Sequence, residues 1–333
     1  MSKYLNQRWL FPLILFSSIA ILLCIADRAP LHLKSRFPAV HLEKESYAYL
    51  DGVVNRTFPG PFVYRVLIPY TVHIAHSVFP LFDPLTIDFA LKTIILMMCQ
   101  VAFFLYLRNF FTDVHCLACV FLLDVLIGHS LAHFQGPSII ETVDLLNVFF
   151  FILALTFIYT NKSITLYITL FLASLNRETI WFVIIVIILH DQLTNRGILR
   201  SLLSLSVVSL SYFGLRLMIG MHEFDWFYIR GLVHNIPFIS EEFTTRAIVG
   251  NLRLAVLLLP MMVIGIYQFK SHPQYLKIAS SIIPVFIVAH YLVGIIIESR
   301  LWMPLFVVLV PLTINNLIKI LRPREEQIPT SPI

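Results

Sequence analysis

The chain has 333 residues, of which 58% are hydrophobic and only 13% are charged, and its mean hydropathy is +0.84. A soluble domain carries roughly a quarter charged residues, so this composition excludes a water-soluble protein and predicts an integral membrane protein with many spans. The apolar residues run continuously and do not alternate, which excludes a transmembrane β-barrel. The formal net charge of +5 reports orientation in a membrane before it reports affinity for nucleic acid.

A bilayer-spanning helix needs about 20 mostly apolar residues. The sequence therefore predicts an all-α, polytopic transmembrane helix bundle of about ten spans. The first follows Lys3 and Arg8 without a small-residue cleavage site, so we expect a retained anchor. The fifth and sixth are short and predict either two short helices meeting at a polar break or a less regular hairpin. The spans are 9–26, 86–107, 114–132, 140–160, 163–175, 179–190, 201–221, 250–268, 278–297 and 301–318.

Basic residues in the short loops predict the orientation. With the N-terminus inside, the short outer turns carry only Arg177 and Arg300. We therefore expect both termini in the cytoplasm and a site facing the periplasm, exterior or lumen. The predicted organisation is one transmembrane domain over 1–320, with outer segments at 27–85 and 222–247 and a cytoplasmic tail at 321–333. The inner segments carry Lys3, Arg8, Arg108, Lys162, Arg196, Arg200, Lys270, Lys277, Lys319, Arg322 and Arg324.

The segment 61–82 predicts an interfacial helix on the outer membrane surface. On a helical wheel, Arg65, His73 and His76 lie within about a quarter turn of one another, and the other faces are apolar. Pro69 limits the length of this helix. Arg65 either binds a lipid phosphate or extends its charged end to the headgroups.

Several charges fall at membrane level on the outer side, where they are costly and usually paired or functional. Arg177 and Glu178 interrupt two apolar runs, Glu298 and Arg300 form a very short turn, and Arg216 lies in the outer half of a span. Arginine binds phosphate oxygens bidentately, so these residues predict one site lined by several helix ends. The alternative is a set of interfacial residues, salt bridges and a structural hinge.

Acidic residues near other potential ligands leave metal and proton chemistry open. Asp124 lies mid-span, where it either serves a proton path or joins helices by a hydrogen bond. His129 and His133 share a helix face but lack an obvious third metal ligand. Glu141 and Asp144 could share a divalent cation or bind a sugar.

Other motifs carry little chemistry. Cys116 and Cys119 form a lone C-x-x-C, which is weak evidence for zinc or redox work and fits ordinary small helix residues. The chain has no phosphate-binding glycine-rich loop, no H-E-x-x-H and no G-x-S-x-G. ATP-driven chemistry is therefore not expected.

The layout resembles that of the polytopic GT-C-type glycosyltransferases, which use polyprenyl-phosphate-linked sugars, and in particular a bacterial-type member of uncharacterised activity. The shared features are a first span from the cytoplasm, a long acidic outer loop, an interfacial helix and many spans joined by short turns. The short motifs that carry the resemblance are the acidic and aromatic stretch 43–52, Tyr64-Arg65, Arg177-Glu178-Thr179 and Glu298-Ser299-Arg300.

The resemblance implies sugar transfer from a lipid-linked donor at the outer membrane face. Glu43 or Glu45, or less readily Asp51, would act as general base; the family usually has Asp in this role. The second outer loop, with Trp226, Tyr228 and His234, would cover the sugar. Arg65, Arg177 or Arg300 would neutralise the departing polyprenyl phosphate. The full set of candidate substrate-binding residues is Arg65, Arg177, Glu178, Arg216, Glu298, Arg300 and His234.

Two other classes of function fit part of the same pattern. A transporter or flippase of a lipid-linked or anionic substrate would explain Asp124, Arg216 and the short broken spans, but predicts inverted repeats that the sequence does not show. A non-catalytic membrane partner of a larger assembly is the third. The expected partners are the lipid-linked donor and membrane lipids.

Overall fold

The computed structural model describes residues 15–23, 39–132, 138–191, 195–220, 235–236, 244–294 and 298–321. Within these ranges the regular structure is entirely helical, which confirms the predicted all-α bundle. Residues 15–23 are helical and precede α2 (Ala39–Val54), η2 (Phe62–Tyr64), α3 (Leu67–Val78), α4 (Pro84–Leu107), α5 (Asp113–Ala132), α6 (Ser138–Tyr159), α7 (Ser163–Asn176), η3 (Glu178–Ile180), α8 (Trp181–His190), α9 (Asn195–Ile219), α11 (Thr244–Ile266), η5 (Phe269–Ser271), α12 (Gln274–Ala279), α13 (Ile282–Val293), η6 (Ser299–Trp302) and α14 (Met303–Leu321).

The described helices account for fewer than the ten predicted spans, and the first predicted span, 9–26, is described only over residues 15–23. In the described part of the chain, 7 are long and apolar enough: α4, α5, α6, α9, α11, α12 with α13, and η6 with α14. This supports a multi-pass membrane protein. The segments predicted at 163–175 and 179–190 are helical, but the 14 residues of α7 reach only about 21 Å, short of a hydrocarbon core of about 30 Å.

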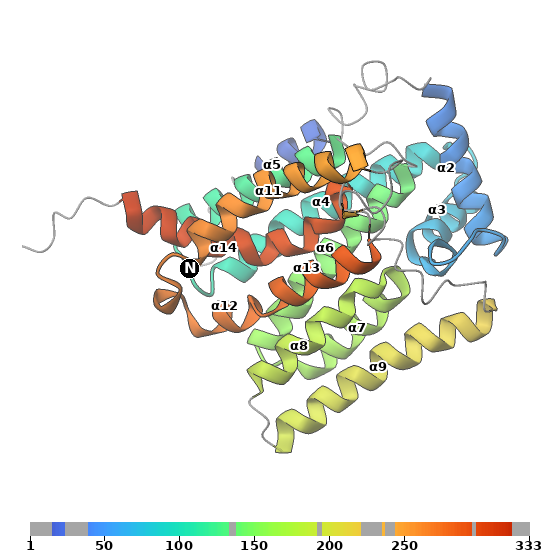
Figure 1. Ribbon diagram of the computed structural model, residues 1–333. Helices are drawn as coiled ribbons and strands as arrows, with labels where there is room; N and C mark the ends of the chain where they lie inside the picture. The colour runs from blue at the N-terminus through green and yellow to red at the C-terminus, as the bar shows by residue number, and fades with distance from the viewer. Residues whose placement is uncertain are drawn as a thin grey trace, which may run out of the picture.

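The centre of the bundle is formed by α6 and α14. Most of the apolar span is buried in α6 (67%) and in η6 with α14 (78%), against 22% in α9 and in α11. In Figure 1, α9 lies along one edge of the bundle while α6 and α14 lie within it. The outward residues of α9, such as Leu210 and Leu217, are more than 70% exposed and therefore suit contact with lipid.

The first of the two segments predicted to lie outside covers one end of the bundle. Figure 1 shows α2 and α3 together at that end. Tyr49 of α2 is fully buried and meets the rings of Phe58 and Phe62 edge to face, at 5.1 and 6.4 Å between centroids. The backbone N–H of Val66 donates to the carbonyl of Leu175 at the end of α7 (3.2 Å). We call residues 39–82 the cap, because they pack over the tip of α7.

The structure corrects where the predicted interfacial helix begins and where Arg65 lies. The helix α3 begins at Leu67, so Arg65 precedes it and does not share a helical face with His73 and His76. Arg65 is only 5% exposed, so an extended side chain at the headgroups is wrong for this residue. The exposed residues of α3 are mixed: Thr71, His73 and Ser77 are polar, and Ile74 and Val78 are apolar.

Buried polar pairs join α4 to α5 and α6. Lys92 donates to Glu141 at 2.6 Å, with both side chains at most 6% exposed. Asp88 accepts from the hydroxyl of Thr142 at 2.7 Å, and Gln100 donates to Asp124 at 3.0 Å. Such contacts satisfy groups that lipid cannot, and Asp124 thus takes the helix-joining role that the sequence left open.

We expect Lys92→Met to lower the free energy of unfolding by about 3–5 kcal/mol, because it leaves Glu141 as a buried charge. Adding Glu141→Gln to Lys92→Met should restore much of the loss. Unfolding by sodium dodecyl sulfate in mixed micelles measures both effects. If Lys92→Met alone is as stable as the unmodified protein, the prediction is contradicted.

Candidate functional site

The break between α7 and α8 is fixed to α6. Arg177 has an extended backbone (φ −160°, ψ 143°), and its buried side chain forms an ion pair with Asp144 of α6. The amide of Asn176 donates to the carbonyl of Val143 at 2.9 Å. Thr179 donates to the side chain of Asn147, one turn further along α6, at 3.1 Å. Hydrogen bonds on either side of Asp144 therefore hold the break in place.

A second arginine reaches the same aspartate from the start of η6. Arg300 contacts Asp144 and Glu298 at 2.6 Å each, through its two terminal nitrogens. Ser299 donates to the carbonyl of Ser130 at 3.3 Å and so positions this turn against α5. Asp144 is 1% exposed and bridges two arginines from different parts of the chain.

The third arginine comes from the cap. Arg65 donates to Glu178 at 3.1 Å, and its guanidinium lies 4.7 Å from the centroid of the Phe62 ring. Its Nε and second terminal nitrogen are buried and have no hydrogen-bond partner among the described residues. These donors lie inside the protein and are available to an acceptor that is not part of the described chain.

The fourth arginine comes from the end of α9. The guanidinium of Arg216 lies 4.2 Å from the ring centroid of Tyr64 and 3.4 Å from that of Tyr212. It is close enough to Glu178 and Arg65 to interact with both electrostatically. Stacking on two aromatic rings fixes the guanidinium plane. One terminal nitrogen also donates to the carbonyl of Tyr212 at 3.2 Å.

Tyr49 adds a hydroxyl to this group. It lies within electrostatic range of Arg65, Arg177 and Arg300, and burial raises its pKa to about 12 despite these arginines. The hydroxyl is therefore protonated at neutral pH and can donate a hydrogen bond. It is buried without a hydrogen-bond partner in the described part of the structure.

These residues form what we call the arginine cluster. It brings four arginines and three carboxylates together, and Arg65 keeps two buried nitrogens without a hydrogen-bond partner among the described residues. Glu178 and Glu298 are 37% and 31% exposed in their side chains, whereas Arg177 and Arg300 are 4% exposed, so the carboxylates mark the open side. Such a site favours an anion. The members are Arg65, Arg177, Arg216, Arg300, Asp144, Glu178 and Glu298.

Six of the ten predicted site residues thus lie together, and the others do not join them in the contacts described. Glu43 and Asp51 are exposed on α2. Asp51 lies about 200° around the helix from Tyr49, whereas Glu45, four residues before Tyr49, is partly buried on the same side. His234 lies outside the described residues, as do His133, Trp226 and Tyr228.

For two members of the site, Asp144 and Tyr49, the sequence did not predict the role that the structure shows. Asp144 was considered as a cation or sugar ligand, but it pairs with two arginines. Nothing in the sequence singled out Tyr49 beyond its place in the acidic and aromatic stretch 43–52. A carboxylate one and a half turns into a span could have been matched to the two membrane-level arginines, since a buried charge needs an opposite charge.

The described residues contain no group of three His, Cys, Asp or Glu that could hold a metal ion. The carboxylates of Glu141 and Asp144 each face a cationic side chain, Lys92 and the two arginines respectively. Cys116 and Cys119 are buried, free thiols on α5. Comparison of the chain with protein-family models, curated proteins and solved structures found no match.

We expect Asp144→Asn to lower the free energy of unfolding by about 3–5 kcal/mol, because two buried arginines lose their shared counter-charge. Asp113→Asn is the matched control. It removes a carboxylate that pairs with Arg108 at 3.1 Å but is 65% exposed, and such a pair contributes about 0–1 kcal/mol. Unfolding in mixed micelles compares the two, and equal losses would contradict the structural role of Asp144.

Proposed function

We propose that the chain is an integral membrane glycosyltransferase that moves a sugar from a polyprenyl-phosphate donor to an acceptor at the extracytoplasmic face. The observation that carries the proposal is the arginine cluster at one end of an apolar bundle. A lipid-linked phosphate enters such a site with its chain in the bilayer and its charged group among the arginines.

The cluster suits a phosphate for three reasons. Arginine presents planar, paired N–H donors that match phosphate oxygens. The donors of Arg65 and the hydroxyl of Tyr49 are buried and have no acceptor in the described residues. Arg65, Arg177 and Arg300 are at most 5% exposed, and charge-assisted hydrogen bonds are stronger where water is excluded.

The same residues support departure of the phosphate during transfer. The bond between the sugar carbon and the phosphate oxygen breaks, and the acceptor oxygen bonds to that carbon. The departing phosphate gains negative charge, which the arginines stabilise without reorganising. The acceptor proton passes to a carboxylate, for which the structure favours Glu45 over Asp51 by its place on the Tyr49 side of α2.

The sidedness of the proposal comes from the loops. The cluster lies where α7 ends and where α6, α8 and η6 begin. The opposite end carries the basic residues Arg108, Lys162 and Lys270 in its connections. Basic connections mark the cytoplasmic side, so the cluster belongs to the extracytoplasmic side.

We expect the purified protein to bind farnesyl phosphate, a short polyprenyl monophosphate, and to bind farnesol at least about tenfold more weakly. Arg65→Gln should weaken the binding of farnesyl phosphate about tenfold or more and leave farnesol unchanged. Arg108→Gln, at the opposite end of the bundle, serves as control. Microscale thermophoresis in detergent measures the affinities, and equal affinity for both lipids would overturn the phosphate site.

Transfer itself is tested with sugar-labelled polyprenyl-phosphate glucose, mannose and galactose in proteoliposomes that contain membrane acceptors. We expect loss of label from one donor, and Glu45→Gln should reduce its rate about 100-fold or more, the scale of general-base catalysis. Asp51→Asn should reduce it far less.

The same assay separates transfer from transport. If labelled donor crosses the bilayer intact, and Asp124→Asn but not Glu45→Gln abolishes this movement, the protein is a flippase. If none of the three donors loses its label while farnesyl phosphate still binds, the transferase assignment fails and the phosphate site stands.

A further inference from the structure

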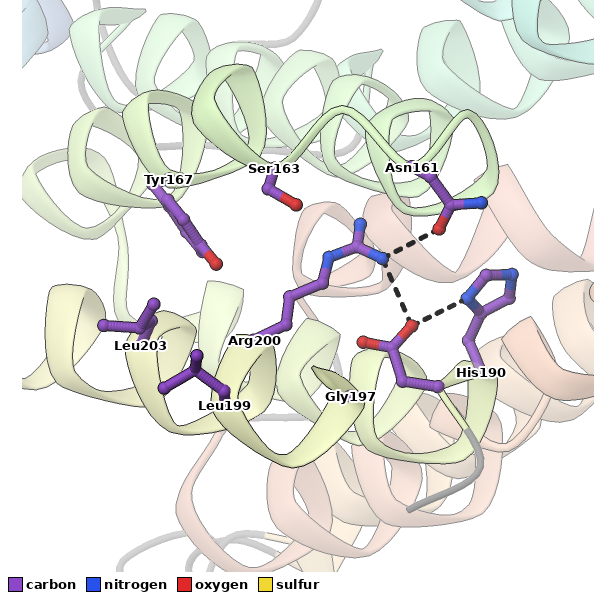
Figure 2. Close-up of a pocket in the computed structure, with 9 residues that line it drawn as sticks. Asn161, Ser163, Tyr167, His190, Gly197, Leu199, Arg200 and Leu203 are labelled. Atoms are coloured by element: carbon purple, nitrogen blue, oxygen red, sulfur yellow. Dashed lines mark hydrogen bonds and ion pairs between the residues drawn. The ribbon is translucent and has the colours of Figure 1, made fainter. Parts of the chain in front are cut away.

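A polar hollow lies at the end of the bundle opposite the arginine cluster, where α7 and α9 begin. Its volume is about 640 Å³. Figure 2 shows the side chains around it, with Arg200 between the residues of α7 above and those of α9 below. It is lined by Asn161, Ser163, Tyr167, His190, Asp191, Gly197, Leu199, Arg200 and Leu203.

Arg200 is the central charge of this hollow and is 9% exposed. One terminal nitrogen donates to Asn161 at 3.0 Å and contacts Asp191 at 3.1 Å, and the other donates to the carbonyl of Phe157 at 3.2 Å. Its buried Nε has no hydrogen-bond partner among the described residues. Figure 2 shows that this edge of the guanidinium faces the side of the hollow where Ser163 and Tyr167 lie.

Other groups at the hollow also favour negative charge. Ser163 is the first residue of α7, and no side chain caps this helix start. The first-turn N–H groups of a helix attract anions. Lys162 precedes them, and the hydroxyls of Ser163 and Tyr167 are further donors. Asp191 is neutralised by Arg200, and His190 contacts Asp191 at 3.1 Å.

The α9 side of the hollow is apolar and open. Leu199 and Leu203 are 59% and 44% exposed, and only 22% of the apolar span of α9 is buried. An occupant therefore meets donors on one side and lipid-facing leucines on the other. This combination matches a membrane lipid with an anionic headgroup better than a water-soluble ion.

We propose that this hollow binds the headgroup of an anionic phospholipid. The phosphate lies among Arg200, Ser163 and Tyr167, and the acyl chains run along Leu199 and Leu203. The site is separate from the arginine cluster, since Arg216 is 16 residues after Arg200 on the same helix, about 24 Å away. It places a structural lipid on the predicted cytoplasmic side, opposite the proposed donor site.

Native mass spectrometry of the full chain in detergent tests the proposal. The protein is titrated with dioleoylphosphatidylglycerol, with dioleoylphosphatidylcholine and with inorganic phosphate. We expect the phosphatidylglycerol to bind about tenfold or more tightly than the phosphatidylcholine. Ser163→Ala and Tyr167→Phe should each weaken this binding about fivefold, the scale of one lost hydrogen bond.

The controls keep the result independent of folding and of sugar transfer. Tyr267→Phe removes the hydroxyl of an exposed tyrosine after α11 and should change nothing. Arg65→Gln should also leave this binding intact. Three results would each overturn the proposal. They are equal binding of the two lipids, unchanged binding in both Ser163→Ala and Tyr167→Phe, and displacement of the lipid by equimolar inorganic phosphate.

Discussion

The ion pairs of Asp144 are the interaction on which the rest of the site depends. This single buried carboxylate neutralises Arg177, from the break after α7, and Arg300, from the start of η6. A charge removed from water costs several kcal/mol unless it is paired and hydrogen-bonded. Three segments far apart in the sequence are thereby held at one point: α6, the α7–α8 break and η6.

The break also explains why a cap is present. Because the chain turns at Arg177, α7 has 14 residues where the adjacent α6 has 22. The difference of 8 residues corresponds to about 12 Å of helix. The chain at the break after α7 is therefore not helical at a depth where its backbone N–H and C=O groups need partners within the protein. The cap fills this place: Val66 donates to Leu175, and Arg65 pairs with Glu178. The shortened helices and the cap are thus two parts of one arrangement.

The sequence predicted the helices well because apolar runs end where charges and prolines begin. The span expected at 86–107 is helical over Pro84–Leu107, and the break at Arg177 lies where it was expected. Within the described residues, the spans predicted at 163–175 and 179–190 are too short, since composition does not register that a short run cannot cross a bilayer alone. Arg65 was assigned to a helix that begins two residues later.

The grouping of the arginines was predictable, but their partners were not. A charged side chain at the depth of the membrane is costly in free energy unless it is paired, so such charges are expected to lie together. That cost does not say whether the counter-charge belongs to a lipid or to the protein. The role of Asp144 depends on contacts with arginines 33 and 156 positions away, in segments whose order in space no local pattern encodes. Tyr49 shows the same limit, because its importance comes from complete burial beside arginines.

Unsatisfied donors distinguish the arginine cluster from a purely structural ion pair such as that of Lys92 and Glu141, whose charged atoms meet at 2.6 Å. In the cluster, two nitrogens of Arg65 and the hydroxyl of Tyr49 are buried and have no hydrogen-bond partner among the described residues. A buried donor without an acceptor costs about 1–3 kcal/mol, so a network that served stability alone would gain by satisfying these groups. A bound anion supplies the missing acceptors, and these donors therefore favour a ligand-binding role over a purely structural one.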